Sequence, residues 1–250
     1  MAEHAHLDPR TPTVVADGVH ITYTERSGPR STRSVHAVKG VSFAAYRGEA
    51  IGLIGLNGSG KSTLLKAVAG LLPTSEGRIY TQGRPALLGV NAALMGDLTG
   101  ERNVILGGLA MGMSRREITA RYADIVDFSG INDKGDFVSL PMRTYSSGMG
   151  ARLRFSIAAA RSHDVLLIDE ALATGDAAFR RRSRQRIDEL RAEAGTVFLV
   201  SHSNTTITET CDRALWLEAG ELRMDGPADE VVAAYEHFTG TATKTTTKRT

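Results

Sequence analysis

The feature that most constrains this chain is the stretch Gly-Leu-Asn-Gly-Ser-Gly-Lys-Ser-Thr at residues 55–63, between an apolar run and a helical-looking segment. Glycines let the backbone curl so that successive N–H groups point inward at phosphate oxygens. The helix that follows begins with unpaired N–H groups and a positive dipole end, which also favour an anion. A strand, this loop and a helix, in that order, predict a phosphate-binding loop on an α/β fold.

Each residue type in the loop has an expected part. Lys61 would reach the β- and γ-phosphates and act in catalysis, the Ser62 hydroxyl would bind Mg²⁺, and Thr63 would hold the α-phosphate. Tyr23, an aromatic residue shortly before the loop, is expected to stack on the adenine ring. The loop residues expected to contact ATP are Gly55, Asn57, Gly58, Ser59, Gly60, Lys61, Ser62 and Thr63.

Composition narrows the class of protein. A chain of 250 residues can bury a sizeable core, and its net charge of +2 argues against a dedicated nucleic-acid binder. Cys211 is the only cysteine, so an intramolecular disulfide is impossible and a reducing compartment is expected. The sequence shows neither a signal peptide nor an apolar run of about 18 residues. We therefore expect a cytosolic protein, or one that reaches a membrane through a partner.

Hydrophobic patterns divide the chain into an α/β core with a helical insertion. Helices are predicted over residues 101–113, 115–128 and 150–161, so a helical subdomain occupies about 98–160. Ser114, with Glu117 three residues later, predicts a capping box. Predicted strands cover 14–23, 35–45, 165–168, 196–200 and 213–217, with a turn-rich insert at 27–31.

The two ends of the chain have a different composition from the single domain expected to span residues 13–238. A final helix is predicted over 228–238. Residues 1–12 are polar and expected to be flexible, and the Thr/Lys-rich tail at 239–250 is expected to be disordered because it has few large apolar residues.

Further chemical groups follow the buried strands. Asp169 and Glu170 close the strand at 165–168, at the edge where open α/β sheets bind ligands. Asp169 suits Mg²⁺, and Glu170 suits the positioning and deprotonation of an attacking water. His202 follows the strand at 196–200 and is expected to contact a γ-phosphate from the same edge.

A second helix start also suits an anion. Ser146, Ser147, Gly148 and Met149 immediately precede the helix predicted from residue 150, and their hydroxyls and free N–H groups form a second anion site. One nucleotide hardly needs two such sites in one chain, so the second suggests a partner subunit. Asp176, in a turn after the two carboxylates, is expected to lie near the same nucleotide edge.

In this order the motifs of residues 14–238 resemble the nucleotide-binding subunits of ABC transporters. The resemblance implies a RecA-like parallel-sheet core, a small antiparallel β subdomain and an inserted helical subdomain. It also implies a head-to-tail dimer, in which ATP on one chain is capped by Ser146 and Gly148 of the other. The matching motifs are Walker A at 55–62, the signature at 145–149, Walker B at 165–169 with Glu170, the D-loop at 173–176 and the switch histidine His202.

Two departures from the family pattern stand out. The signature usually reads Leu-Ser-Gly-Gly-Gln, whereas Tyr145, Ser147 and Met149 replace three of those residues here. The glutamine of the Q-loop is also absent from the segment 88–94, where Asn91 is the best substitute as a Mg²⁺ ligand.

Within this family the chain resembles exporters of polysaccharides and teichoic acids, through residues 98–103, 140–149 and 201–203. That resemblance implies a peripheral ATPase at the cytoplasmic face of the bacterial inner membrane, bound to two copies of an integral-membrane permease, with no nucleic-acid partner. It implies ATP and Mg²⁺ as cofactors. An ABC exporter of a different solute remains an alternative.

Two other classes of protein are weighed against the exporter. A soluble ABC-type ATPase acting on DNA or ribosomes would use the basic run at residues 180–186, but this run lies on a predicted helix where pairs such as Arg184 with Asp188 favour a solvated face. A P-loop kinase would leave both the signature helix and His202 without a role. ATPase stimulation by a membrane subunit would separate the exporter from the soluble class.

Overall fold

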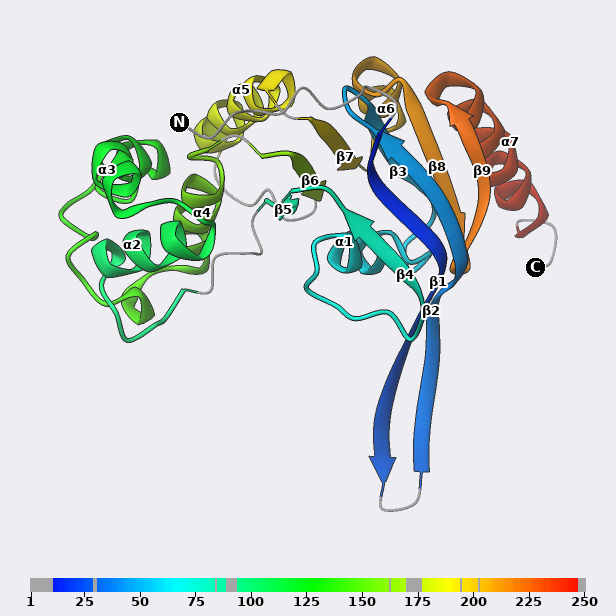
Figure 1. Ribbon diagram of the computed structural model, residues 1–250, viewed down its shortest axis with the longest axis horizontal. Helices are drawn as coiled ribbons and strands as arrows, with labels where there is room; N and C mark the ends of the chain where they lie inside the picture. Colours follow the sequence, from blue (N-terminus) through cyan, green and yellow to red (C-terminus); the bar gives the residue numbers. More distant parts are fainter. Residues whose placement is uncertain are drawn as a thin grey trace.

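Two β-sheets organise the chain, seen together in Figure 1. The structure is a computed structural model that describes residues 11–28, 31–83, 85–88, 94–161, 163–169, 177–193, 195–201 and 203–246. The larger sheet has six strands in the order β5-β6-β7-β3-β8-β9, parallel except for the antiparallel edge strand β9. Its strands are β3 (Ala50–Ile54), β5 (Pro85–Leu87), β6 (Val165–Asp169), β7 (Thr196–Val200), β8 (Arg213–Glu218) and β9 (Glu221–Pro227).

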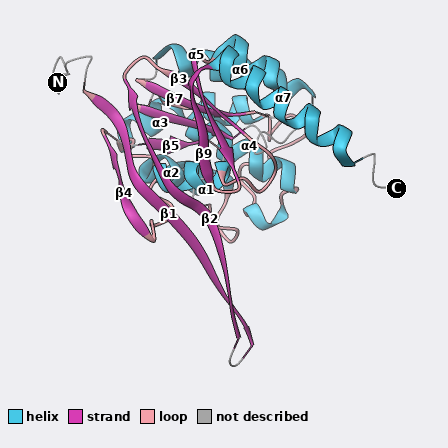
Figure 2. Cartoon of the chain, turned by 90° about the vertical axis from the view of Figure 1, so that its right-hand side faces the viewer, coloured by secondary structure: helices cyan, strands magenta, loops and turns pink. Residues whose placement is uncertain are grey.

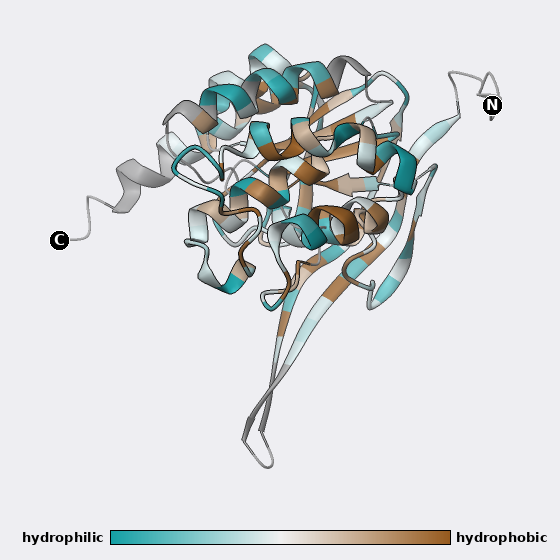
Figure 3. Ribbon diagram, turned by 90° about the vertical axis from the view of Figure 1, so that its left-hand side faces the viewer, coloured by the Kyte–Doolittle hydropathy of each residue, from teal (hydrophilic) through white to brown (hydrophobic). Residues whose placement is uncertain are grey.

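The central strands are apolar because both faces of the sheet are covered. Every residue of β6 and β7 is buried. Successive side chains of a strand point to opposite faces, so Leu167 and Phe198 enter one hydrophobic cluster and Leu166 and Leu199 enter the other. In Figure 3 the inner strands are largely hydrophobic, and the helices along the top of the view are largely hydrophilic. The predicted buried strands at these two places are confirmed.

The smaller sheet is antiparallel, with the order β2-β1-β4 (Figure 2). It consists of β1 (Pro12–Gly28), β2 (Ser31–Tyr46) and β4 (Glu76–Thr81). The sequence predicted that β1 would end at Tyr23 and β2 begin at Val35, but the ladder continues through the turn-rich segment, and Gly28 pairs with Ser31. The two strands therefore form a long hairpin whose ladder runs out to the Gly28–Ser31 pair, and it extends away from the body in Figure 1.

Helices cover the sheets in separate groups. The helix α1 lies between the two sheets, where it contacts β2, β4, β5 and β7. The helices α6 and α7 pack together and contact β3, and α7 also covers β8 and β9. The helices of the core are α1 (Lys61–Val68), α5 (Ala177–Glu193), α6 (Asn204–Thr210) and α7 (Ala228–Thr246).

The predicted helical subdomain is a separate group of three helices, at the left of Figure 1. Its helices share a third hydrophobic cluster, which includes Val104, Ile125 and Leu153. The capping box at the start of α3 is confirmed, because Ser114 and Glu117 exchange side-chain and backbone hydrogen bonds. The group contains α2 (Gly100–Ala110), α3 (Arg115–Ser129), a short 3₁₀ turn (Met142–Thr144) and α4 (Ser147–Ala158).

Several elements differ from the sequence prediction. Strand β9 and helix α6 were not predicted, because β9 is an edge strand without a fully buried residue and α6 is rich in threonine, a weak helix former. Helix α7 was expected to end at Phe238 but continues to Thr246, so helix replaces the expected disorder over residues 239–246. Residues 247–250 and 1–10 lie outside the described residues.

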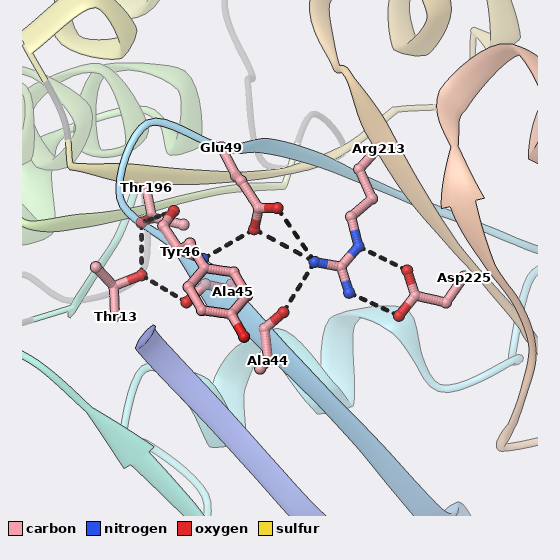
Figure 4. Close-up of polar contacts among 8 residues, drawn as sticks. All are labelled: Thr13, Ala44, Ala45, Tyr46, Glu49, Thr196, Arg213 and Asp225. Carbon is pink, nitrogen blue, oxygen red and sulfur yellow. Dashed lines mark hydrogen bonds and ion pairs between the residues drawn. The ribbon is translucent and has the colours of Figure 1, made fainter. Parts of the chain in front are cut away.

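A polar network joins the two sheets at the amino ends of the parallel strands (Figure 4). Arg213, at the start of β8, binds both carboxylate oxygens of Asp225 at 2.6 and 2.7 Å and donates to the Ala44 carbonyl at 2.8 Å. The same guanidinium lies 3.3 Å from Glu49. Beside it, the hydroxyls of Thr13 and Thr196 are 2.6 Å apart. This network fixes the antiparallel sheet on the edge opposite the carboxyl ends of the strands.

We predict that Arg213→Met lowers the free energy of unfolding by about 2 kcal/mol, because it leaves two acids and a carbonyl partly buried without their donor. Arg223→Met is the matched control, since among the described residues Arg223 pairs with Glu218 alone and its side chain is 53% exposed, against 22% for Arg213. That exposed pair should be worth less than about 1 kcal/mol. Urea unfolding measures both, and equal losses would contradict a stapling role for Arg213.

Candidate nucleotide-binding site

The glycine-rich loop has the curled backbone that its sequence predicts. It connects the end of β3 to the start of α1, and Gly55, Gly58 and Gly60 adopt φ angles of 142°, 82° and 104°. A side chain is strained at such angles. Space is a second constraint, because a Cβ on Gly60 would overlap the Ala37 carbonyl oxygen of β2. The loop is therefore shaped by its glycines and pressed against the antiparallel sheet.

Lys61 lies inside the curl of the loop. Its Nζ donates to the carbonyl oxygens of Gly55 at 2.7 Å and Leu56 at 2.9 Å. Burial lowers the pKa of the Lys61 ammonium, and the negative charge of Asp169 partly opposes that shift. A cation held in this position, within a glycine-rich turn at the start of a helix, is suited to phosphate oxygens.

The structure brings together the two residues that the sequence assigned to Mg²⁺ from distant stretches. The Ser62 hydroxyl donates to Asp169 Oδ2 at 2.7 Å, although 107 positions separate them. Asp169 ends β6, which is separated from β3 by one strand, so the two parallel strands end at the same edge. A hydroxyl and a carboxylate at this spacing are hard oxygen ligands that suit Mg²⁺ together with a nucleotide phosphate.

Tyr23 lies beside the same helix start. Its hydroxyl is 3.3 Å from Thr63 Oγ1, and the residue is 42% exposed. The hydrogen bond places the aromatic ring next to the loop with part of its surface open to solvent. The stacking of Tyr23 on adenine remains a prediction.

Four residues expected in the site lie outside the described residues: Asn91, Glu170, Asp176 and His202. Their roles stay predictions. The strands before two of them, β6 and β7, are parallel neighbours, so both end at the edge of the sheet where Asp169 lies. In the sequence, Glu170 follows the last residue of β6, and His202 follows β7 by two positions.

The second predicted anion site falls at the start of α4, which begins at Ser147 and so three residues earlier than predicted. Ser146 is its N-cap and accepts a hydrogen bond from the Met149 N–H at 3.2 Å. Ser146 and Ser147 are exposed, whereas Met149 packs against the cluster of the helical subdomain. The hydroxyls and remaining N–H groups of this first turn are therefore accessible to an anion from outside the chain.

Sequence reasoning did not assign a role to Asn103, which is fully buried in α2. Its side-chain amide donates to the carbonyls of Met95, Leu98 and Thr99, and its oxygen accepts from the Met95 N–H at 2.7 Å. These four bonds fix the chain that follows residues 89–93. The sequence does place an asparagine next to the apolar residues of α2. That position could have indicated a structural role for Asn103, because a polar side chain buried there needs hydrogen-bond partners.

The fold and this site define a P-loop nucleotide-binding protein. A glycine-rich loop precedes a helix, and the Ser62 hydroxyl in the first turn of that helix bonds to the Asp169 carboxylate at the end of a parallel strand of the same sheet. The family described as ABC transporter matches residues 38–173. The chain belongs to that family.

Several relatives with sequence identity near 40% carry the name teichoic acids export ATP-binding protein TagH. The chain is 40% identical to the Staphylococcus saprophyticus protein over 82% of this chain and 77% of that protein. For Staphylococcus epidermidis the identity is 40%, over 85% and 79% of the two chains. The Lactococcus lactis protein is 38% identical over 85% of this chain, which spans 45% of that longer relative.

Solved structures with lower sequence identity share the fold. The structure titled ATP binding subunit of ABC transporter superposes with a TM-score of 0.69 at 23% identity, over 89% of this chain and 93% of that one. A dimeric post-hydrolysis state of the ATP-binding cassette MJ0796, bound to ADP and Pi, gives a TM-score of 0.67 at 21% identity, over 86% and 98% of the two chains. The α/β fold predicted from the motifs is therefore confirmed.

We predict that Gly60→Ala weakens ATP binding at least tenfold, because the added methyl group meets the Ala37 carbonyl and displaces the loop. Gly70→Ala is the matched control at the other end of α1: its φ is 71°, but its Cβ would have no heavy atom within 4 Å. Both variants should lose about 1 kcal/mol of stability from backbone strain. Titration with a fluorescent ATP analogue measures the affinity, and equal affinity in the two variants would contradict the steric argument.

Proposed function

We propose that this chain is the ATP-hydrolysing motor of an ABC exporter that moves teichoic acid, or a similar lipid-linked glycopolymer, across the bacterial cytoplasmic membrane. The observation that carries the chemistry is the Ser62–Asp169 contact at the mouth of the glycine-rich loop. The substrate class is supported by relatives that are 40% identical over more than four-fifths of the chain and are named for teichoic acid export.

The residues of the site divide the work of ATP hydrolysis. Lys61 and the loop N–H groups hold the phosphates, and Ser62 and Asp169 hold Mg²⁺, with Asn91 as a further ligand in place of the family's glutamine. Mg²⁺ supplies charge neutralisation on the β- and γ-phosphates. Glu170 orients and deprotonates the attacking water, and His202 contacts the γ-phosphate.

The catalytic unit in this proposal is a head-to-tail pair of chains. The exposed start of α4 supports it, because the loop in front of α1 already provides one phosphate site within the chain. Ser146, Ser147 and Gly148 of one chain then cap the ATP held by the other. Asp176, which lies outside the described residues, keeps its expected place near the nucleotide edge. The ATP-binding cassette MJ0796, which shares the fold, is itself dimeric.

A membrane partner is part of the proposal. Within the part of the chain that the structure describes, every helix is too short or too polar to span a membrane. The helical subdomain carries an apolar docking patch, defined as the exposed residues Met95, Ile105, Leu106, Leu109 and Leu140. Ile105, Leu106 and Leu109 lie on α2, and Met95 and Leu140 hydrogen-bond through their main chains to residues in the first turn of that helix. Exposed apolar residues on one element favour a protein contact. We assign this patch to two copies of the permease, which would hold the motor at the cytoplasmic face.

The alternative of a soluble ATPase acting on nucleic acid finds less support. Within the basic run at 180–186, Arg186 is half-buried, donates to the Ala159 carbonyl at 2.9 Å and pairs with Glu189 at 2.8 Å. The predicted pair of Arg184 with Asp188 stays a prediction, because the Arg184 side chain lies outside the described part of the chain. Part of this run therefore serves packing between α5 and the end of α4, and we propose no nucleic-acid partner.

The cellular test removes ATP turnover while leaving polymer synthesis intact. In a strain carrying Lys61→Ala, lipid-linked polymer should accumulate on the cytoplasmic side and the envelope should lose it, because the cation that holds the phosphates is gone. Lys66→Ala is the matched control, since Lys66 is an exposed lysine on the same helix α1. Fractionation of the lipid-linked and surface-bound polymer measures the outcome.

Normal surface glycopolymer in the Lys61→Ala strain, with a different solute retained, would contradict the substrate assignment and leave the ATPase assignment standing. Loss of export in both variants would instead indicate a general defect in the protein.

A further inference from the structure

The segment that leads into α4 is joined by backbone hydrogen bonds to the segment that leads into α2. We call residues 94–101 the docking segment, because it contains Met95 of the apolar docking patch. The two segments pair through Thr99 and Pro141, with flanking bonds in both directions. These bonds are Arg143 N–H to Gly96 O at 2.8 Å, Met142 N–H to Leu98 O at 2.9 Å, Gly100 N–H to Leu140 O at 3.3 Å and Glu101 N–H to Val138 O at 3.1 Å.

Tyr145 stands between this ladder and the cap residue Ser146. Its backbone N–H donates to the Met142 carbonyl at 3.0 Å. Its hydroxyl donates to the Phe137 carbonyl at 2.7 Å. The ring is half-buried and packs against the hydrophobic cluster of the helical subdomain. Tyr145 is therefore attached at both its main chain and the far end of its side chain.

Gly100, at the start of α2, makes room for that hydroxyl. A Cβ on Gly100 would overlap Tyr145 Oη and would lie 2.9 Å from the Val138 carbonyl oxygen. Burial raises the pKa of the Tyr145 hydroxyl, and the Gly100 N–H opposes that shift. The hydroxyl therefore keeps its proton at neutral pH and remains a hydrogen-bond donor.

Because Tyr145 directly precedes Ser146, the hydrogen bond of its hydroxyl affects the start of α4. Ser146 follows directly and caps α4, so the orientation of its hydroxyl depends on the backbone that Tyr145 fixes. Leucine, the usual residue here in the family that the motifs resemble, has an apolar side chain and offers no donor to the Phe137 carbonyl. The hydroxyl anchor is thus a consequence of the residue that this chain carries in place of leucine.

We propose that Tyr145 is a positioning residue that locks the start of α4 to the docking segment, so that a displacement at the docking patch reaches the phosphate-contacting Ser146. The lock consists of the Tyr145 hydroxyl bond, the space provided by Gly100 and the backbone ladder beside them. The inference rests on the proposed function only for the identity of what Ser146 and the docking patch contact.

The test uses the full chain with Tyr145→Phe, which removes the hydroxyl and keeps the ring. Tyr122→Phe is the matched control, because the Tyr122 hydroxyl is buried in the same subdomain without a hydrogen-bond partner among the described residues. In Tyr145→Phe, the N–H groups of Met149 and Gly150, which bond to Ser146, should exchange with solvent about fivefold faster, the scale of one net hydrogen bond.

Kinetics separate positioning from a merely structural role. The kcat of ATP hydrolysis in Tyr145→Phe should fall about tenfold, because Ser146 is misplaced, while the affinity of the monomer for an ATP analogue stays within about twofold. Gly100→Ala reaches the same hydroxyl from the other side and should cost less in the Tyr145→Phe background than alone, because the overlap with the hydroxyl is then absent.

Unchanged amide exchange at Met149 and Gly150 in Tyr145→Phe would overturn the proposal, as would equal losses in the Tyr122→Phe control. Should Gly100→Ala fail to fold, the exchange measurement on Tyr145→Phe still decides. Neither measurement involves the permease or the polymer, so a failure here leaves the export assignment untouched, and a failure of the export test leaves this result standing.

Discussion

The hydrogen bond between the Ser62 hydroxyl and the Asp169 carboxylate sets the constraint that the rest of the structure has to meet. It forms only if β3 and β6 run parallel, one strand apart, and end at the same edge of the sheet. Parallel strands need long crossovers, and these put helices on both faces and require apolar side chains on each side. The buried strands, the surrounding helices and the nucleotide edge all follow from this one geometry.

The two edges of the sheet do different work. At the amino ends of the strands, Arg213 and Thr196 tie the six-stranded sheet to the antiparallel one through bonds that leave little polar surface free. At the carboxyl ends, Lys61, Ser62 and Asp169 gather beside a glycine-rich loop. The contacts that hold the two sheets together thus lie at one edge and the candidate site at the other. This separation is expected, because a binding edge needs backbone groups that are not already paired within the sheet.

Local patterns predicted the elements that local physics determines. The glycine-rich loop, the strands β6 and β7 and the capping box at Ser114 were all readable because spacing or residue type fixes them. Tertiary contacts decided the elements that were missed. The antiparallel edge strand β9 is held by its pairing with β8. The strands β1 and β2 continue past their apolar stretches because backbone hydrogen bonds between them, rather than side-chain burial, hold that part of the hairpin.

The candidate site was predictable to the same extent. The residues proposed to contact a phosphate follow from motif and order, but the lock around Tyr145 does not. Its backbone ladder joins carbonyls and N–H groups that are about 40 positions apart, and its hydroxyl bonds to the main-chain carbonyl of Phe137. A tyrosine in place of leucine indicated a departure without showing what its hydroxyl would bind. Backbone ladders between irregular segments have no sequence signature, because they depend on main-chain groups that every residue carries.

In the proposed head-to-tail pair, one chain holds ATP on its glycine-rich loop and a second chain completes the site with the start of α4. Sedimentation of the Glu170→Gln protein, which should bind ATP without turning it over, tests this claim directly. We expect a monomer without nucleotide, a dimer with Mg-ATP, and no dimer when Ser146→Arg is added, because bulk and positive charge then occupy the facing site. Ser139→Arg, an exposed serine in the same subdomain, should leave the dimer intact. A mass that ignores ATP, or equal dimerisation of the Ser146→Arg variant, would contradict the account.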